Sequence, residues 1–291
     1  MKTKYKRVLR WAAGATLGVL VLAAAVLLYQ VRKPPIVNSY YVAFGSSFAA
    51  GPGLGPLAPG SPWLSYRSIN GYPQQLARLV RVPSFTDMTS SGSTVRHVLH
   101  GGQFMLGPQI DALGPDTQLV TMTAGGNDVS YVGDLGAMAY MNRGGVIGSA
   151  FRAFWKEPQP IERRDFSGLA ANLRATIQEI RKRSPGARIV LVTYPAIVPK
   201  TGTCKALGIS DEQASLIRAV GNKLAETTAD TATAMGATVV NMAALSTGHD
   251  ACSSDPWVNG FEPKEGQFFH PTLAGAHATA LAIATAIQTH D

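Results

Sequence analysis

Residues 118–128 read QLVTMTAGGND, and this stretch decides the fold class. Its first six residues are mostly β-branched or apolar, as expected of a short buried strand. The glycines that follow allow a tight turn, so that Asn127 and Asp128 come directly after the strand. Polar side chains in such a position lie at the carboxyl edge of a parallel sheet, where α/β proteins bind ligands. The stretch therefore predicts an α/β protein with a functional residue at the end of this strand.

Similar apolar stretches recur along the chain and alternate with segments of helical periodicity. Within residues 166–183, for example, leucines and isoleucines recur at every third or fourth position. Such alternation predicts a mostly parallel sheet with helices on both faces. We expect five strands, over residues 40–44, 84–89, 118–123, 188–193 and 238–242, and helices over residues 71–80, 166–183, 211–235 and 272–288.

Composition and charge exclude several classes of protein. Of 291 residues, 46% are apolar and 15% charged, so the chain is neither disordered nor a coiled coil. The formal net charge of +8 would by itself suggest a nucleic-acid or membrane-surface partner. However, seven of the 26 Lys and Arg residues and none of the 18 Asp and Glu residues lie within residues 1–33. The remainder is nearly neutral, and we therefore expect no nucleic-acid partner.

Residues 11–31 carry no charge, and we expect them to form a transmembrane helix. At about 1.5 Å per residue they span roughly 31 Å, which matches the hydrocarbon core of a bilayer. Five basic residues precede this segment and two follow it, which favours a cytoplasmic N-terminus and an extracytoplasmic remainder. Cleaved signals usually have a shorter apolar region. We therefore favour an uncleaved signal anchor over residues 1–33, and the alternative is a cleaved signal that leaves a secreted protein.

Both interpretations export the rest of the chain, which consists of a stiff linker over residues 34–39 and a globular domain over residues 40–291. Export favours a disulfide between Cys204 and Cys252, and the alternative is two buried free thiols. The two cysteines are far apart in sequence, and neither an H-E-x-x-H nor a C-x-x-C motif is present. We expect no metal and no other cofactor.

Four residues carry the candidate chemistry. Ser47 follows the first expected strand in FGSSFAAG, and it could act as a nucleophile at the sheet edge. Gly92 follows the second strand and Asn127 the third, and both could donate hydrogen bonds to a developing oxyanion. His270 precedes the last helix, again at the sheet edge, and it could act as the base that a serine nucleophile needs. Each residue alone is also typical of a turn or a helix cap, so the evidence is their order along successive elements.

These residues resemble the SGNH (GDSL-type) hydrolase family over about residues 40–290. The sequence GSS at 45–47 is similar to the family's first block, Gly92 to the second, GGND at 125–128 to the third, and HP at 270–271 to the fourth. The resemblance implies a flavodoxin-like three-layer α/β/α sandwich that hydrolyses esters through an acyl-enzyme on Ser47. It also implies that His270 is the base and that the N–H groups of Ser47 and Gly92 and the Asn127 side chain hold the oxyanion.

The sequence departs from the family pattern at two positions. Ser46 stands where the family usually has Asp, and Gln267 stands where a D-x-x-H motif would supply the acid of a triad. A branch of the family uses a main-chain carbonyl instead, and the stretch CSSDPW at 252–257 resembles that branch. We therefore expect a Ser-His dyad in which the Gln267 carbonyl accepts from Nδ1–H of His270. Asp250 or Asp255 remains an alternative acid.

The substrate is less constrained by the sequence than the chemistry is. Aromatic residues in an insertion over 129–165 and in the loop 51–63 would suit an apolar acyl chain. The insertion is a candidate lid, or else a packed excursion. We expect an exported, membrane-anchored esterase or lipase acting on lipid-like or acylated envelope esters. The alternatives are acyl transfer to, or deacylation of, a glycan, and an inactive membrane-tethered binding module.

Overall fold

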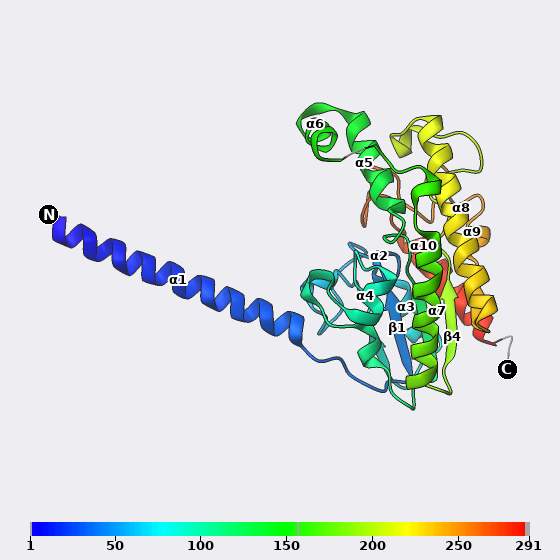
Figure 1. The fold of residues 1–291 in the computed structure, drawn as a ribbon, viewed down its shortest axis with the longest axis horizontal. Helices are drawn as coiled ribbons and strands as arrows, with labels where there is room; N and C mark the ends of the chain where they lie inside the picture. Colours follow the sequence, from blue (N-terminus) through cyan, green and yellow to red (C-terminus); the bar gives the residue numbers. More distant parts are fainter. Residues whose placement is uncertain (1, 156, 289–291) are drawn as a thin grey trace.

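A five-stranded sheet forms the centre of the computed structural model, which describes residues 2–155 and 157–288 (Figure 1). Its strands pair in the order β2-β1-β3-β4-β5, and every pair is parallel. The predicted parallel α/β/α sandwich is therefore confirmed. The strands are β1 (Tyr41–Gly45), β2 (Phe85–Asp87), β3 (Leu119–Thr123), β4 (Arg188–Val192) and β5 (Thr238–Val240).

The interior strand β1, which lies between β2 and β3, contributes to both halves of the hydrophobic core. Val42 and Phe44 belong to the cluster on one face of the sheet, and Tyr41 and Ala43 belong to the cluster on the other. This alternation follows from the two-residue period of a strand. Because helices cover both faces, all five residues of β1 are buried, which explains why the strand reads as a continuous apolar run.

The helices form two layers around the sheet (Figure 1). Helices α3 (Tyr72–Leu79) and α10 (Leu273–Gln288) pack on the face that contains Tyr41. The opposite face is covered by α4 (Val95–His100), α5 (Tyr131–Arg143), α7 (Phe166–Arg183) and α8 (Asp211–Ala234). The shorter elements are α2 (Ser47–Ala50), α6 (Gly145–Phe154), α9 (Met242–Leu245), η1 (Trp63–Ser65), η2 (Gln103–Met105), η3 (Gln109–Ala112), η4 (Ile161–Arg163) and η5 (Lys205–Leu207).

The N-terminal helix α1 (Lys2–Arg32) projects away from the sandwich (Figure 1). Its segment Trp11–Arg32 has a mean hydropathy of 2.2 and is long and apolar enough to cross a membrane. The segment that follows α1 rejoins the domain along the edge of β2, where Thr86 Oγ1 donates to the Ile36 carbonyl at 3.0 Å. The exit of α1 is therefore fixed to the edge strand of the sheet.

Cys204 and Cys252 form a disulfide, so the alternative of two free thiols is wrong. The bridge joins the loop between β4 and α8 to the loop that follows α9. The two cysteines are 48 positions apart in the sequence. A cross-link over a separation of this length lowers the conformational entropy of the unfolded chain, and chain-entropy models give about 4 kcal/mol of stabilisation.

We expect the double variant Cys204→Ser/Cys252→Ser to lose about 2–4 kcal/mol of unfolding free energy, measured by urea denaturation. Wild-type protein unfolded in dithiothreitol should give the same midpoint as the double variant. A midpoint that neither the double substitution nor reduction changes would contradict this account.

Candidate active site

Three of the predicted site residues follow three adjacent strands. Ser47 comes after β1, Gly92 after β2 and Asn127 after β3, and these strands are neighbours in the order β2-β1-β3. Because the strands are parallel, their carboxyl ends meet at one edge of the sheet. His270 reaches the same edge from the loop before α10.

The side chains of Ser47 and His270 form the centre of the site. The Ser47 hydroxyl and Nε2 of His270 are 2.8 Å apart, and both residues are buried. Ser47 is the first residue of α2, so its N–H has no partner within the helix and remains a donor for another group. A hydroxyl at hydrogen-bond distance from an imidazole nitrogen is the geometry of a nucleophile and its base.

The second ring nitrogen of His270 lies against a carbonyl two residues earlier in the chain. Nδ1 is 2.8 Å from the Phe268 oxygen, so the expectation that Gln267 supplies this carbonyl is wrong. The Gln267 oxygen instead accepts from Asn259 Nδ2 at 3.2 Å and from the His270 N–H at 3.3 Å. Phe269 adopts a left-handed conformation with φ of 58°, and the chain turns there between Phe268 and His270.

The two alternative acids are engaged elsewhere. Asp250 Oδ1 accepts from the Cys252 N–H at 2.9 Å. Asp255 lies against a different histidine: its Oδ2 is 3.3 Å and its carbonyl oxygen 2.8 Å from Nδ1 of His249. The His249 ring stacks on Trp257 with centroids 4.1 Å apart. The partner observed for Nδ1 of His270 is thus a main-chain carbonyl, as a dyad requires.

The Asn127 side chain is hydrogen-bonded to the turn that carries Gly92. Asn127 Nδ2 donates to the Ser93 carbonyl at 2.9 Å, and an amide nitrogen has a second hydrogen left to donate. Gln109 joins this turn to β1, because its Nε2 donates to Ser93 Oγ at 3.2 Å and to the Gly45 carbonyl at 3.0 Å. Gly92 has φ of 78°, a conformation that side-chain-bearing residues rarely adopt.

Asp128 holds the same turn from the other side. Its two carboxylate oxygens accept from the Val95 N–H at 3.0 and 3.2 Å, at the start of α4. Burial raises the pKa of Asp128 above its ordinary value, and the bonds from Val95 oppose that rise. The second polar residue of the GGND block therefore connects the end of β3 to the turn that carries Gly92.

Tyr194, which the sequence analysis missed, occupies the space around Ser46. Ser46 Oγ is 2.8 Å from the Tyr194 hydroxyl, which also accepts from the Gly126 N–H at 3.0 Å. The Tyr194 ring lies 4.5 Å from Phe48, whose ring in turn lies 5.2 Å from His270. The signal that could have found Tyr194 is its position directly after the strand RIVLVT, at the same sheet edge.

A buried ion pair, also missed, supports the chain that leads to Gly92. Arg67 Nε lies 3.8 Å from Asp87 and donates to the Thr89 carbonyl at 2.6 Å, and Nη1 donates to the Asp87 carbonyl. The Asp87 carboxylate also accepts from Thr89 and Gln74. Burial raises the pKa of Asp87, and Arg67 opposes this shift. These groups fix the backbone between β2 and the Gly92 turn.

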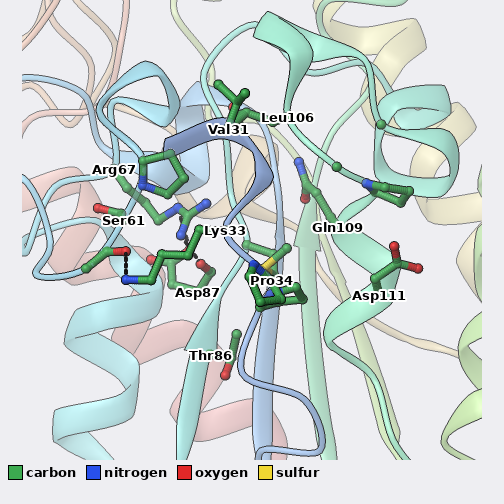
Figure 2. Close-up of a pocket in the computed structure, with 18 of the residues that line it drawn as sticks. Val31, Lys33, Pro34, Ser61, Arg67, Thr86, Asp87, Leu106, Gln109 and Asp111 are labelled. Atoms are coloured by element: carbon green, nitrogen blue, oxygen red, sulfur yellow. Dashed lines mark hydrogen bonds and ion pairs between the residues drawn. The ribbon is translucent and has the colours of Figure 1, made fainter. Parts of the chain in front are cut away.

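A cavity of about 650 Å³ lies on the β2 side of the Gly92 turn, and its lining includes none of Ser47, Gly92, Asn127 and His270. Its wall includes Ser90 and Ser93, which flank the Gly92 turn, and the hydroxyl of Ser90 is buried without a hydrogen-bond partner in the described chain. Figure 2 shows the Arg67–Asp87 pair on one side of this cavity and Gln109 on the other. The segment that follows α1 forms a further wall, so the cavity lies between the site and the exit of the N-terminal helix.

Burial keeps His270 in its neutral form. The loss of solvation lowers the pKa of His270 to about 4, and the bond to the Phe268 carbonyl only partly opposes this shift. At neutral pH the imidazole is thus free to accept a proton from Ser47. We find in this geometry a hydroxyl, a neutral base and candidate donors for an anion at one edge of the sheet.

Comparisons with known proteins agree with this arrangement. The GDSL-like lipase/acylhydrolase family matches residues 43–278. The chain is 31% identical to lipase 2 of Streptomyces coelicolor over 277 residues, which cover 93% of this chain and 90% of that protein. It is similar in structure to phospholipase A1 from Streptomyces albidoflavus, with a TM-score of 0.67 and 25% identity. This match covers 87% of this chain and 99% of that protein. For an extracellular lipase from Streptomyces rimosus the TM-score is 0.66 and the identity 26%, and the match covers 84% of this chain and 98% of that protein.

The low pKa of His270 has a measurable consequence. The rate at which a fluorophosphonate labels Ser47 should stay high as the pH falls from 8 and should reach half its maximum near a pH of about 4. In the unfolded chain His270 has its ordinary pKa, so as the pH falls below that value the unfolded chain binds a proton that the folded chain does not. The folded state therefore loses stability as the pH falls toward 4, and circular dichroism must verify that the protein is still folded. A midpoint near pH 6.5 would show that burial does not lower this pKa.

The identity of the Nδ1 acceptor predicts which side chains are dispensable. Gln267→Ala and Asp255→Asn should each change the labelling rate of Ser47 by less than about tenfold, because neither side chain holds the His270 ring. The comparison is His270→Ala, which should lose labelling. A loss of about 10³–10⁴ in either of the first two variants would indicate that its side chain acts as the third member of a triad.

Proposed function

The chain belongs to the GDSL-like lipase/acylhydrolase family and is a serine ester hydrolase, and we propose that Ser47 is its nucleophile and His270 its general base. The observation that carries this proposal is the distance of 2.8 Å between Ser47 Oγ and His270 Nε2. The low pKa of the His270 imidazole supports it, because a base must be unprotonated when the reaction begins.

The reaction proceeds in two halves. Ser47 Oγ attacks the ester carbonyl carbon while its proton moves to Nε2 of His270, and a tetrahedral intermediate forms. The intermediate collapses, the bond to the alcohol oxygen breaks, and the alcohol leaves with the proton from Nε2. Water then attacks the acyl-enzyme in the same way, and the acid is released while Ser47 recovers its proton.

The Phe268 carbonyl orients the base throughout this cycle. Its oxygen accepts from Nδ1–H, which fixes the tautomer in which Nε2 is the free acceptor. When His270 becomes protonated, the carbonyl dipole stabilises the imidazolium, a task that a carboxylate performs in a triad. The mechanism is therefore a Ser-His dyad completed by the main chain.

Three donors would hold the oxyanion: the N–H groups of Ser47 and Gly92 and the side chain of Asn127. They come from the ends of three adjacent strands, and Asn127 retains one amide hydrogen after its bond to the Ser93 carbonyl. Removal of one such donor typically lowers kcat by about 10²–10³. In this view Asp128, Gln109 and Arg67 act indirectly, by fixing the backbone that carries the donors.

We also propose that the enzyme works outside the cytoplasm, anchored by α1. The apolar segment Trp11–Arg32 is long enough to span a bilayer, and basic residues are concentrated on its N-terminal side. The disulfide between Cys204 and Cys252 is favoured in an oxidising compartment.

The substrate class that we infer is a carboxylic ester with an apolar acyl chain. The relatives named above are lipases and a phospholipase A1. The cavity whose wall includes Ser90 and Ser93 has apolar lining residues such as Phe85, Met88 and Leu106, although none of the proposed reacting groups lines it. It lies on the side from which a membrane-anchored enzyme would receive a lipid.

We expect Ser47→Ala and His270→Ala to abolish hydrolysis of p-nitrophenyl butyrate, because each removes a reacting group. Asn127→Ala should lower kcat by about 10²–10³ and leave KM nearly unchanged, because the oxyanion exists only after attack. Circular dichroism of each variant is the control for folding. Full activity of folded Ser47→Ala would exclude this serine as the nucleophile.

A further inference from the structure

Helix α6 stands apart from the sandwich and carries the most exposed apolar side chains of the domain. Figure 1 shows it at one extremity of the domain, beyond the tip of α5. Val146 is 89% exposed, Ile147 60% and Phe154 90%. Soluble proteins leave single apolar residues in water, but a cluster of this kind on one short helix marks an interaction surface.

These residues lie on one face of the helix. Val146, Ala150 and Phe154 are spaced four residues apart and therefore form a stripe, with Ile147 and Ala153 beside it. All five are exposed. We call this stripe, residues 146, 147, 150, 153 and 154, the α6 face.

The opposite side of α6 is the side that packs on the protein. Gly148 is buried against the Tyr140 carbonyl of α5, and the Phe151 ring stacks on the Tyr140 ring with centroids 4.9 Å apart. An ordinary surface helix buries its apolar face against the core, whereas the apolar stripe of α6 points away from the core. Rotation of α6 on α5 would not bury the stripe without breaking these contacts.

Helix α6 and the turn before it carry two arginines, whereas Glu157 follows the helix and Glu262 lies beside the turn. Residues 135–155 contain Arg143 and Arg152 and no acidic residue, although Arg143 is paired with the exposed Glu262 at 3.3 Å. An apolar helical stripe flanked by arginines is the pattern of a helix that lies in the interface of an anionic membrane.

The position of α6 fits the same partner. In Figure 1, α1 extends from the lower left of the domain along the long axis of the molecule, and α6 lies at the upper left, so both are on the same side of the sandwich. A bilayer spanned by Trp11–Arg32 would therefore face the side of the domain on which α6 lies. From the stripe, the charge and this position, we propose that the α6 face docks into the interfacial layer of an anionic lipid bilayer, as a second membrane contact beside α1.

Docking would bring the active site to the lipid surface. The Phe151 ring stacks on Tyr140, and the Tyr140 ring lies 5.7 Å from Phe268, the residue whose carbonyl orients His270. The docked helix is thus connected to the catalytic histidine through two aromatic contacts. This consequence rests on the proposed ester hydrolysis, whereas docking itself does not, so the two can be tested separately.

The docking test uses the full chain with Ser47→Ala, reconstituted through α1 into nanodiscs of phosphatidylcholine and phosphatidylglycerol with one chain per disc. Val146→Cys carries an environment-sensitive fluorophore, and both native cysteines are held in the disulfide. The control label is at Glu226→Cys, an exposed position on α8. We expect lipid-borne doxyl groups to quench the label at 146 and leave the label at 226 bright.

Three results would overturn docking. If aqueous iodide quenches both labels equally, the α6 face stays in water. If the label at 146 is shielded from iodide but not quenched by doxyl lipid, α6 has folded onto its own domain. Shielding that appears only when several chains share one vesicle would identify a second copy of the chain as the partner, and it would likewise overturn docking on lipid.

The activity test compares two kinds of ester. Val146→Glu/Phe154→Glu should lower hydrolysis of a vesicle-embedded long-chain ester by about tenfold or more, because it removes two apolar groups from the interface. Hydrolysis of soluble p-nitrophenyl butyrate should not change. Leu245→Glu, at an exposed leucine on α9, is the matched control and should leave both rates unchanged. Equal loss on both esters would contradict the proposal, and a wild type inactive on both would instead refute the proposed function.

Discussion

The close contact between the ends of β1 and β3 is the constraint on which the site depends. The Ser46 N–H donates to the Thr123 carbonyl at 2.9 Å, and a Cβ at position 45 would lie only 2.4 Å from the same oxygen. Gly45 also has φ of 140°, so no other residue fits there without strain. The contact fixes Ser47 two residues beyond β1 while Asn127 lies four residues beyond β3. The proposed nucleophile and the proposed oxyanion donor are thereby held by adjacent parallel strands rather than by long loops.

The sequence predicts the frame of this arrangement well, because local patterns determine it. Strands buried on both faces produce continuous apolar runs, so β3 and β4 lie where residues 118–123 and 188–193 were expected. The capping box of Ser210 and Gln213 likewise marks the start of α8. The weak stretch 84–89 shortens to the three residues of β2, because an edge strand pairs on one side only. The order of Ser47, Gly92, Asn127 and His270 then follows from the order of the elements.

What the sequence does not predict is set by turns and buried side chains. The acceptor of Nδ1 is Phe268 rather than Gln267 because Phe269 turns in the left-handed region, a conformation that no local pattern around HP indicates. Arg67 and Asp87 are 20 residues apart in the sequence, and Ser46 and Tyr194 are 148 residues apart. The spacing of these residues in the sequence therefore does not indicate either contact. Such contacts depend on how layers pack. They explain how Ser46 is accommodated where the family pattern has Asp: the Tyr194 hydroxyl bonds it to the strand ends.

The carbonyl partner and the burial of His270 are physically connected. A carboxylate at Nδ1 would stabilise the imidazolium and raise the pKa of His270, whereas the Phe268 carbonyl does so only partly and leaves that pKa near 4. A base of low pKa holds the proton of Ser47 less firmly, but it is predominantly neutral at pH 7. In the proposed dyad, transition-state stabilisation therefore depends more on the donors that hold the oxyanion than on the strength of the base. This dependence explains why so much of the buried polar structure, from Arg67 to Asp128, supports the Gly92 turn rather than the histidine.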